Sequence, residues 1–153
     1  SLLADYHRLT LVRIAIEDNN KLGVSNIEFD LPQPSYTIHT LVSLAERFPD
    51  HDFSIIMGED NLNTFQKWKN YEQLLEYYNL LVYPRVESDE NLTVNTSAPS
   101  EFLDYPKVTL IDAPLMKISA SFIRKSIKEG KDVRYLLTEP VSKYIEEMHF
   151  YKK

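Results

Sequence analysis

The sequence contains no cysteine, which excludes disulfide bonds, thiolate metal sites and cysteine nucleophiles. Glycine is nearly as scarce, with three residues in 153, and neither a P-loop nor a GxGxxG fingerprint is present. No apolar stretch approaches the roughly 20 residues that a membrane-spanning helix requires. Because the missing cysteine is also compatible with a reducing cytosol, we expect a cytoplasmic protein without a membrane partner.

Positive charge is also limited, since 17 Lys and Arg residues face 23 Asp and Glu residues, for a formal net charge of -6. A surface of this sign repels a phosphate backbone, so we expect no nucleic-acid partner. The histidines are scattered without paired spacing, at His7, His39, His51 and His149. No His/Asp/Glu set resembles a metal site, so the sequence identifies neither a metal ligand nor a catalytic residue.

Hydrophobic residues are abundant, at 43% of the chain, and 12% of the residues are aromatic. A chain of this length and composition can fill one core, so we interpret residues 1–153 as a single domain. Helical patterns are found over 4–18, 38–48, 61–78, 119–129 and 140–148. Short apolar runs typical of strands are found over 24–29, 53–57, 80–83 and 108–111. The segment 84–106 lacks periodicity, and we expect a long loop there.

Helices that alternate with continuously apolar strands predict an α/β fold, a doubly wound parallel sheet covered on both faces. A doubly wound domain should open with a strand, whereas this chain opens with a helix and with Ser1. We therefore expect that an N-terminal strand is absent from the given chain.

The segment 118–124, Ile-Ser-Ala-Ser-Phe-Ile-Arg, carries the strongest chemical signal. Ser119, Ser121 and Arg124 place two hydroxyls and a guanidinium at a helix start, where unpaired N–H groups and a positive partial charge favour an anion. This pattern predicts a phosphate clamp for a nucleotide. The alternative is ordinary capping, with Ser119 as the N-cap and Arg124 as a solvated helix residue.

In open α/β sheets, ligands bind beyond the carboxyl ends of the strands, so the residues that follow each strand are candidates. After 53–57, Gly58 would let a ligand approach the backbone, and Asp60 could accept hydrogen bonds from ribose hydroxyls. A turn with a helix cap explains these two residues equally well. Arg85 follows 80–83 and is either a phosphate ligand or a solvated side chain.

Three more candidates are aromatic or lie at a helix start. Trp68 is the only tryptophan, and its neighbours over 66–70 are polar, so it is either a stacking platform for a flat ring or a core or surface anchor. Tyr36 and Thr37 lie at the start of a predicted helix, where free N–H groups could bind a carboxylate or where a side chain could simply cap the helix.

Taken in order, several short motifs resemble those of the bacterial nicotinate-mononucleotide adenylyltransferase family. They are Pro-Ser-Tyr-Thr-Ile (34–38) through Leu41, Met-Gly-Glu-Asp-Asn (57–61), Trp-Lys (68–69), Tyr-Pro-Arg (83–85) and the segment 118–124. The segments 130–136 and 140–145 resemble the C-terminal signature of that family, so the resemblance spans nearly the whole chain. Each motif alone is weak, and their ordered combination is specific.

This resemblance implies a Rossmann-like nucleotidyltransferase of NAD biosynthesis. Its reaction transfers the adenylyl group of ATP to nicotinate mononucleotide and gives deamido-NAD and pyrophosphate with Mg²⁺, so the implied partners are small-molecule nucleotides. By resemblance, Ser119, Ser121 and Arg124 hold the ATP phosphates, and Gly58 and Asp60 lie against the nucleotide ribose.

The resemblance also implies a site for nicotinate mononucleotide. Tyr36 and Thr37 with nearby backbone recognise the nicotinate carboxylate, Trp68 stacks on the pyridine ring, and Arg85 belongs to the same site. A homo-oligomer is compatible with the sequence, and the preference between nicotinate and nicotinamide mononucleotide stays open.

The chain departs from the family pattern in two places. The family's first strand carries a Gly-x-Phe-Asp/Asn-Pro-x-His-x-Gly-His motif whose histidines contact the phosphates, and no residue of this chain matches it. We therefore expect the chain as given to be inactive and poorly stable. Ala120 and Ser121 stand where the family more often has Ser-Thr, and Ser121 keeps the hydroxyl.

Three alternatives accompany this interpretation. The chain could be a phosphopantetheine adenylyltransferase-like enzyme, a non-catalytic nucleotide-binding module, or an α/β interaction domain in which every motif is a cap or a turn. Trp68 and the segment 35–37 favour the pyridine substrate over phosphopantetheine.

Overall fold

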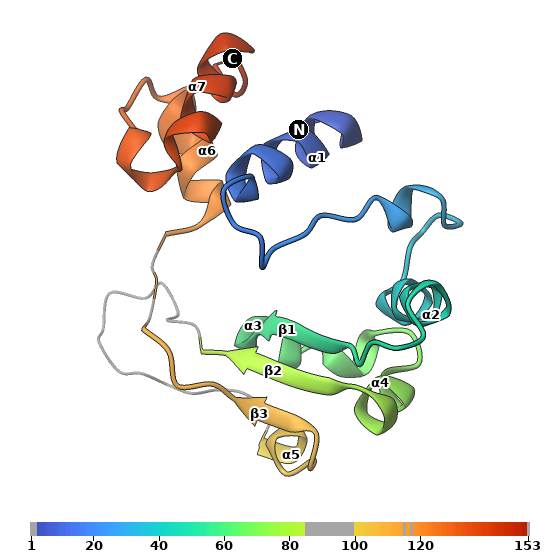
Figure 1. Ribbon diagram of the computed structural model, residues 1–153. Coiled ribbons are helices and arrows are strands. Elements are labelled where there is room, and N and C mark those ends of the chain that lie inside the picture. The colour runs from blue at the N-terminus through green and yellow to red at the C-terminus, as the bar shows by residue number, and fades with distance from the viewer. Residues whose placement is uncertain (1–2, 85–99, 115, 117, 153) are drawn as a thin grey trace. The chain divides into compact units, whose positions relative to one another are not determined.

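The computed structural model describes residues 3–84, 100–114, 116 and 118–152 (Figure 1). The chain divides into two compact units. Unit 1 comprises Ser1–Asn26 and Ile118–Lys153, and unit 2 comprises Ile27–Lys117. The interpretation of residues 1–153 as a single domain stays a prediction.

Unit 2 is built on a parallel sheet whose strands lie in the order β1-β2-β3 (Figure 1). The strands are β1 (Ser54–Gly58), β2 (Asn79–Tyr83) and β3 (Val108–Leu110). The last residues of β1 and β2, Gly58 and Tyr83, are paired in register, so the carboxyl ends of these strands are level. The predicted α/β fold with a parallel sheet is therefore confirmed.

Between β1 and β2 the chain is helical, as expected for a parallel crossover. The elements of this unit besides the strands are η1 (Ile27–Phe29), α2 (Thr37–Arg47), α3 (Glu59–Leu62), η2 (Phe65–Lys67), α4 (Tyr71–Tyr77) and α5 (Ser100–Leu103). The helix α2 ends just before Pro49, which agrees with the predicted segment 38–48.

The core of unit 2 lies between the helices and one face of the sheet. Side chains alternate along β2, so Leu80 and Val82 are fully buried in the same core as Met57 of β1 and Val108 of β3. The helices contribute Ile38, Leu41, Leu62, Phe65, Leu74, Leu75 and Phe102 to this core. On β1, the alternate residue Ile56 is 74% exposed, so the helices of this unit cover one face of the sheet.

Unit 1 is helical, with α1 (Asp5–Ile16), α6 (Ala120–Lys128), η3 (Arg134–Leu136) and α7 (Glu139–Glu147). Its core combines Val141 and Ile145 of α7 with Phe150, and Leu11 and Ile14 of α1 pack against them. The helix α6 ends before Gly130, as predicted for the helix over 119–129. Gly130 has a φ of 71°, which glycine adopts readily. Pro140 lies in the first turn of α7, where its missing N–H is not needed.

The strand predicted over 24–29 is wrong, because Ile27–Phe29 forms the 3-10 helix η1. Its backbone pairs locally, since the N–H of Asp30 donates to the carbonyl of Ile27 and the N–H of Leu31 to that of Glu28. The hydroxyl of Thr40 on α2 also donates to the Glu28 carboxylate at 2.7 Å. These bonds fix a turn where apolar composition alone indicates a strand.

In the described part of the predicted loop over 84–106, the residues Ser100–Leu103 form the helical turn α5, so the loop prediction is wrong for these residues. Phe102 explains the turn, because it is 4% exposed and its ring lies 5.8 Å from that of Phe65 in the core. The stretch 85–99 lies outside the described residues. In the part of the chain that the structure describes, no helix combines the length and the apolar character that crossing a membrane requires.

Candidate functional site

The start of α6 holds the two hydroxyls and the guanidinium of the predicted phosphate clamp. Ser119 has an extended backbone, and its Oγ accepts a hydrogen bond from the N–H of Phe122 at 3.1 Å. Ser119 is therefore the N-cap of α6, as the capping alternative requires. A hydroxyl has a second lone pair and one donor, so this bond leaves it able to contact an anion.

Arg124 turns back toward the first turn of the same helix. One guanidinium nitrogen donates to the Oγ of Ser121 at 3.0 Å, which uses one of the five N–H donors of the group. The first turn of α6 carries no acidic residue, so the helix does not neutralise its own positive end. The structure brings Ser119, Ser121 and Arg124 together within unit 1, with two hydroxyls and a cation at the end of the helix that attracts anions.

The end of β1 in unit 2 carries the second predicted pair. Gly58 has φ -76° and ψ 151°, a conformation open to any residue, so its role is not backbone freedom. A Cβ at this position would lie 2.5 Å from Oδ1 of Asp60, which shows that the carboxylate rests directly against the glycine. The missing side chain of Gly58 therefore makes room for the carboxylate of Asp60.

Tyr36 and Thr37 lie at the start of α2, also in unit 2. Tyr36 is the N-cap, its side chain does not cap the helix, and its carbonyl accepts from the N–H groups of His39 and Thr40. Among the described residues no hydrogen bond is found for the N–H groups of Thr37 and Ile38, as expected for the first turn of a helix without a side-chain cap.

Trp68 closes the 3-10 helix η2, and its N–H donates to the carbonyl of Phe65. Its ring lies 5.3 Å from the ring of Phe65, which is fully buried, and Trp68 itself is half-buried. The ring is thus anchored on the core through a residue three positions earlier, although no apolar stripe surrounds it in the sequence. The exposed part of the ring is available to a ligand, and the stacking role stays a prediction.

One residue that the sequence did not single out for chemistry completes this part of unit 2. The ammonium of Lys69 lies 4.5 Å from the ring centroid of Tyr36, a cation–π contact that links the start of α2 to the segment of Trp68. The signal available beforehand was only its position next to Trp68. Tyr36 and Lys69 therefore lie side by side, and Trp68 is the residue before Lys69 in the chain; we call these three residues the Lys69 neighbourhood.

The remaining predicted residue, Arg85, lies outside the described residues. Just before it, the phenol of Tyr83 at the end of β2 donates to the carbonyl of Pro114, which follows β3. Among the described residues, no group of three or more His, Asp or Glu side chains could hold a metal ion.

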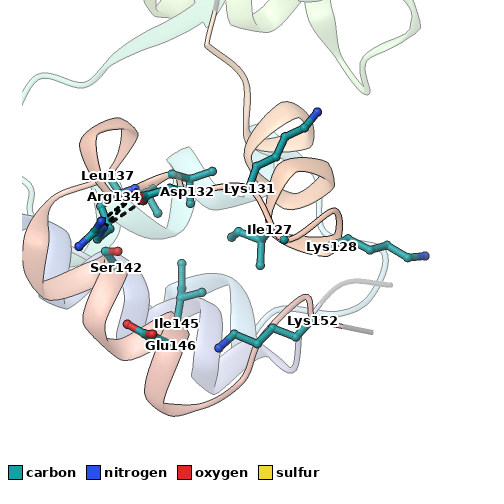
Figure 2. A pocket seen from close by; sticks show the side chains of 12 residues that line it. Ile127, Lys128, Lys131, Asp132, Arg134, Leu137, Ser142, Ile145, Glu146 and Lys152 are labelled. Carbon is teal, nitrogen blue, oxygen red and sulfur yellow. Dashed lines mark hydrogen bonds and ion pairs between the residues drawn. The ribbon is translucent and has the colours of Figure 1, made fainter.

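A cavity among the described residues lies elsewhere, at the opposite end of α6 from Ser119 (Figure 2). It has a volume of about 540 Å³ and lies between the end of α6, η3 and α7. In Figure 2, Ile127 and Ile145 face each other across it, while Lys128 and Lys131 extend away. None of the predicted site residues lines this cavity.

A surface ion pair at the rim of this cavity joins Asp132 and Arg134 at 2.6 Å. Hydrogen bonds from the guanidinium and the backbone N–H of Arg134 lower the pKa of the Asp132 carboxyl from 3.8 to about 2. The pair satisfies both charges locally, so this rim offers no free guanidinium for a phosphate.

Comparison with known proteins supplies the family. The model of the cytidylyltransferase-like family matches residues 1–126. A "probable nicotinate-nucleotide adenylyltransferase" of Flavobacterium johnsoniae is 52% identical over 153 residues, which cover 100% of this chain and 76% of that protein. A protein of the same name from Christiangramia forsetii is 51% identical over 152 residues, 99% of this chain and 75% of its own length.

Solved structures agree on the fold. The nicotinic acid mononucleotide adenylyltransferase of Plasmodium falciparum, complexed with NaAD, has a TM-score of 0.73 at 20% identity and covers 99% of this chain and 76% of its own. The family model and the similarity above 50% identity over this whole chain agree on the family. The chain belongs to the nicotinate-nucleotide adenylyltransferase family, within the cytidylyltransferase-like proteins.

Proposed function

We propose that this protein transfers the adenylyl group of ATP to nicotinate mononucleotide, giving deamido-NAD and pyrophosphate, a step of NAD biosynthesis. The observation that carries the proposal is the 52% identity, over the whole chain, to the Flavobacterium johnsoniae protein named for this activity. The cation and aromatic rings around Tyr36 and the clamp at the start of α6 support it.

The chemistry is a single displacement at phosphorus. A phosphate oxygen of nicotinate mononucleotide forms a bond to the α-phosphorus of ATP, the bond to the bridging oxygen breaks, and pyrophosphate leaves with that electron pair. No covalent enzyme intermediate is needed, so the protein acts by positioning the reactants and by stabilising charge on the transferring group. Bound to ATP, Mg²⁺ would neutralise part of the charge of the triphosphate.

Each unit contributes residues to this proposal. In unit 1, Ser119, Ser121 and Arg124 at the start of α6 bind ATP phosphates through hydroxyls, first-turn N–H groups and the guanidinium. In unit 2, Gly58 and Asp60 lie against a ribose, whose hydroxyls donate to the carboxylate.

The acceptor nucleotide has its own residues in unit 2. The half-exposed ring of Trp68 stacks on the pyridine ring, and its anchoring on Phe65 limits the entropy that stacking costs. Tyr36 and Thr37 at the start of α2 contact the nicotinate carboxylate through the unpaired N–H groups of the first turn.

The experiment that tests the function measures pyrophosphate release by the product of the complete reading frame, with ATP and Mg²⁺. Nicotinate mononucleotide is compared with nicotinamide mononucleotide and with phosphopantetheine. We expect release with the nicotinate form, and deamido-NAD as the second product. A folded protein that binds ATP and releases no pyrophosphate with the nicotinate form would overturn the proposal in favour of a non-catalytic module or of another acceptor.

Replacing Gly58 with alanine tests the ribose contact. The new Cβ would displace the carboxylate of Asp60, because only 2.5 Å separates it from Oδ1. Losing one charged hydrogen bond is expected to weaken ATP binding about tenfold. The free energy of unfolding is expected to change by less than about 1 kcal/mol, since the backbone conformation suits alanine and the displaced atom ends a flexible side chain.

The matched control for Gly58→Ala is Gly23→Ala, because a Cβ at Gly23 meets no atom within 4 Å. Calorimetric titration of both variants with ATP measures the affinity, and chemical unfolding measures the free energy of unfolding. Unchanged ATP affinity in Gly58→Ala would remove Asp60 from the proposed site.

A further inference from the structure

We infer that Lys69 is the residue that makes the acceptor site prefer an acid over an amide, and this inference rests on the proposed function. Nicotinate and nicotinamide mononucleotide share the pyridinium ring, the ribose and the phosphate. They differ in one group, which is a charged carboxylate in the first and a neutral carboxamide in the second. A cationic side chain can therefore separate them by charge.

The backbone around Lys69 is held on both sides. The preceding residue, Trp68, is anchored by its ring on Phe65 and by the bond from its N–H to the Phe65 carbonyl. The following residue, Asn70, has a φ of 54° as the N-cap of α4, and its side-chain amide donates to Gln73 at 3.0 Å. The backbone position from which the Lys69 side chain extends is therefore fixed, between the 3-10 helix η2 and the helix α4.

The position of the Lys69 ammonium is also defined by a contact with an aromatic ring. It lies over the ring of Tyr36 at 4.5 Å from the centroid, and that ring makes an edge contact with His39, whose ring centroid is 5.5 Å away. An aromatic face attracts a cation without neutralising it. Among the described residues no carboxylate forms an ion pair with Lys69, so its charge remains open to an anionic ligand.

The other polar groups of this neighbourhood do not discriminate by charge in the same way. Backbone N–H groups at the start of α2 can donate to the oxygen of a carboxamide as well as to a carboxylate, and the helix start adds only a partial positive charge. The ring of Trp68 stacks on a pyridinium in either nucleotide. A charge-assisted bond from an ammonium is possible in full strength only with the carboxylate. Lys69 is therefore the specificity-determining side chain of this neighbourhood.

The test compares Lys69→Met with the wild-type protein, because methionine keeps an unbranched stem against Tyr36 and removes the charge. We expect kcat/KM for nicotinate mononucleotide to fall on the order of 10- to 100-fold, mainly through KM, while the value for the nicotinamide form changes less than about twofold. Lys69→Arg should recover most of the preference. Lys67→Met is the matched control, since Lys67 is an exposed lysine at the end of η2, and it should keep the wild-type ratio.

The outcomes separate the inference from the function on which it rests. An equal loss with both nucleotides would mean that Lys69 serves the shared phosphate, and it would overturn the inference. An unchanged ratio in Lys69→Met, in a wild type that prefers the acid, would also overturn it and leave the function intact. A wild type that releases pyrophosphate with neither nucleotide would overturn the proposed function and the inference together.

Discussion

Replacing Arg124 with alanine is expected to lower kcat/KM for ATP by about 100-fold, which corresponds to roughly 2.7 kcal/mol of lost transition-state stabilisation. The guanidinium lies at the start of α6 with one donor on Ser121 and four donors left for phosphate oxygens. Both a charge and a planar set of donors disappear in the variant. Steady-state kinetics at saturating nicotinate mononucleotide measures the loss.

The control for Arg124→Ala is Lys125→Ala, one residue further along the same helix. Lys125 is exposed and lies 3.9 Å from Glu129 in an i,i+4 pair, which is a surface contact of little energetic weight. We expect this variant to keep the activity of the wild type. Equal kcat/KM values for ATP in the two variants would show that the start of α6 binds no phosphate. Ser119 would then serve only as the N-cap of the helix.

Replacing Phe65 with alanine is expected to lower the free energy of unfolding by about 3–5 kcal/mol. The side chain is 0% exposed, and its ring lies 5.3 Å from Trp68, 6.1 Å from Tyr71 and 5.8 Å from Phe102. Removing it opens a cavity under η2, where α4 and α5 meet the sheet. Urea unfolding followed by circular dichroism measures the change.

The control for this substitution is Phe48→Ala, in the same unit and of the same chemistry. Phe48 is 43% exposed at the end of α2, so its side chain buries much less apolar area than that of Phe65. We expect the free energy of unfolding to fall by about 1 kcal/mol in this variant. Similar losses in the two variants would contradict the position of Phe65 at the centre of the core.

The helices and the strands β1–β3 are predictable because their side chains follow simple periods. Leu80 and Val82 lie in one short apolar run and Met57 in another, and runs of this length are typical of buried strands. The segment 24–29 also contains apolar residues, yet its backbone bonds locally, and the Glu28 side chain accepts from Thr40, twelve positions further along the sequence. A local pattern contains no information about that partner, so the 3-10 helix η1 could not be predicted.

The same limit applies to the candidate site. Ser119 and Arg124 are predictable because capping and phosphate binding both depend on the local order of residues at a helix start. The neighbourhood of Lys69 is not, because its contact with Tyr36 joins two segments more than thirty positions apart and depends on how η2 packs. Trp68 looks isolated in the sequence for the related reason that its support, Phe65, lies one 3-10 turn earlier.

The position of Trp68 has an optical consequence. It is the only tryptophan of the chain, so indole emission comes from one ring at the edge of the core of unit 2. Because part of that ring contacts Phe65 and part is open, its emission is expected to shift when unit 2 unfolds and to be quenched when a flat aromatic ligand covers it. The protein therefore carries its own fluorescent reporter, which follows folding and ligand binding at the same residue without a label.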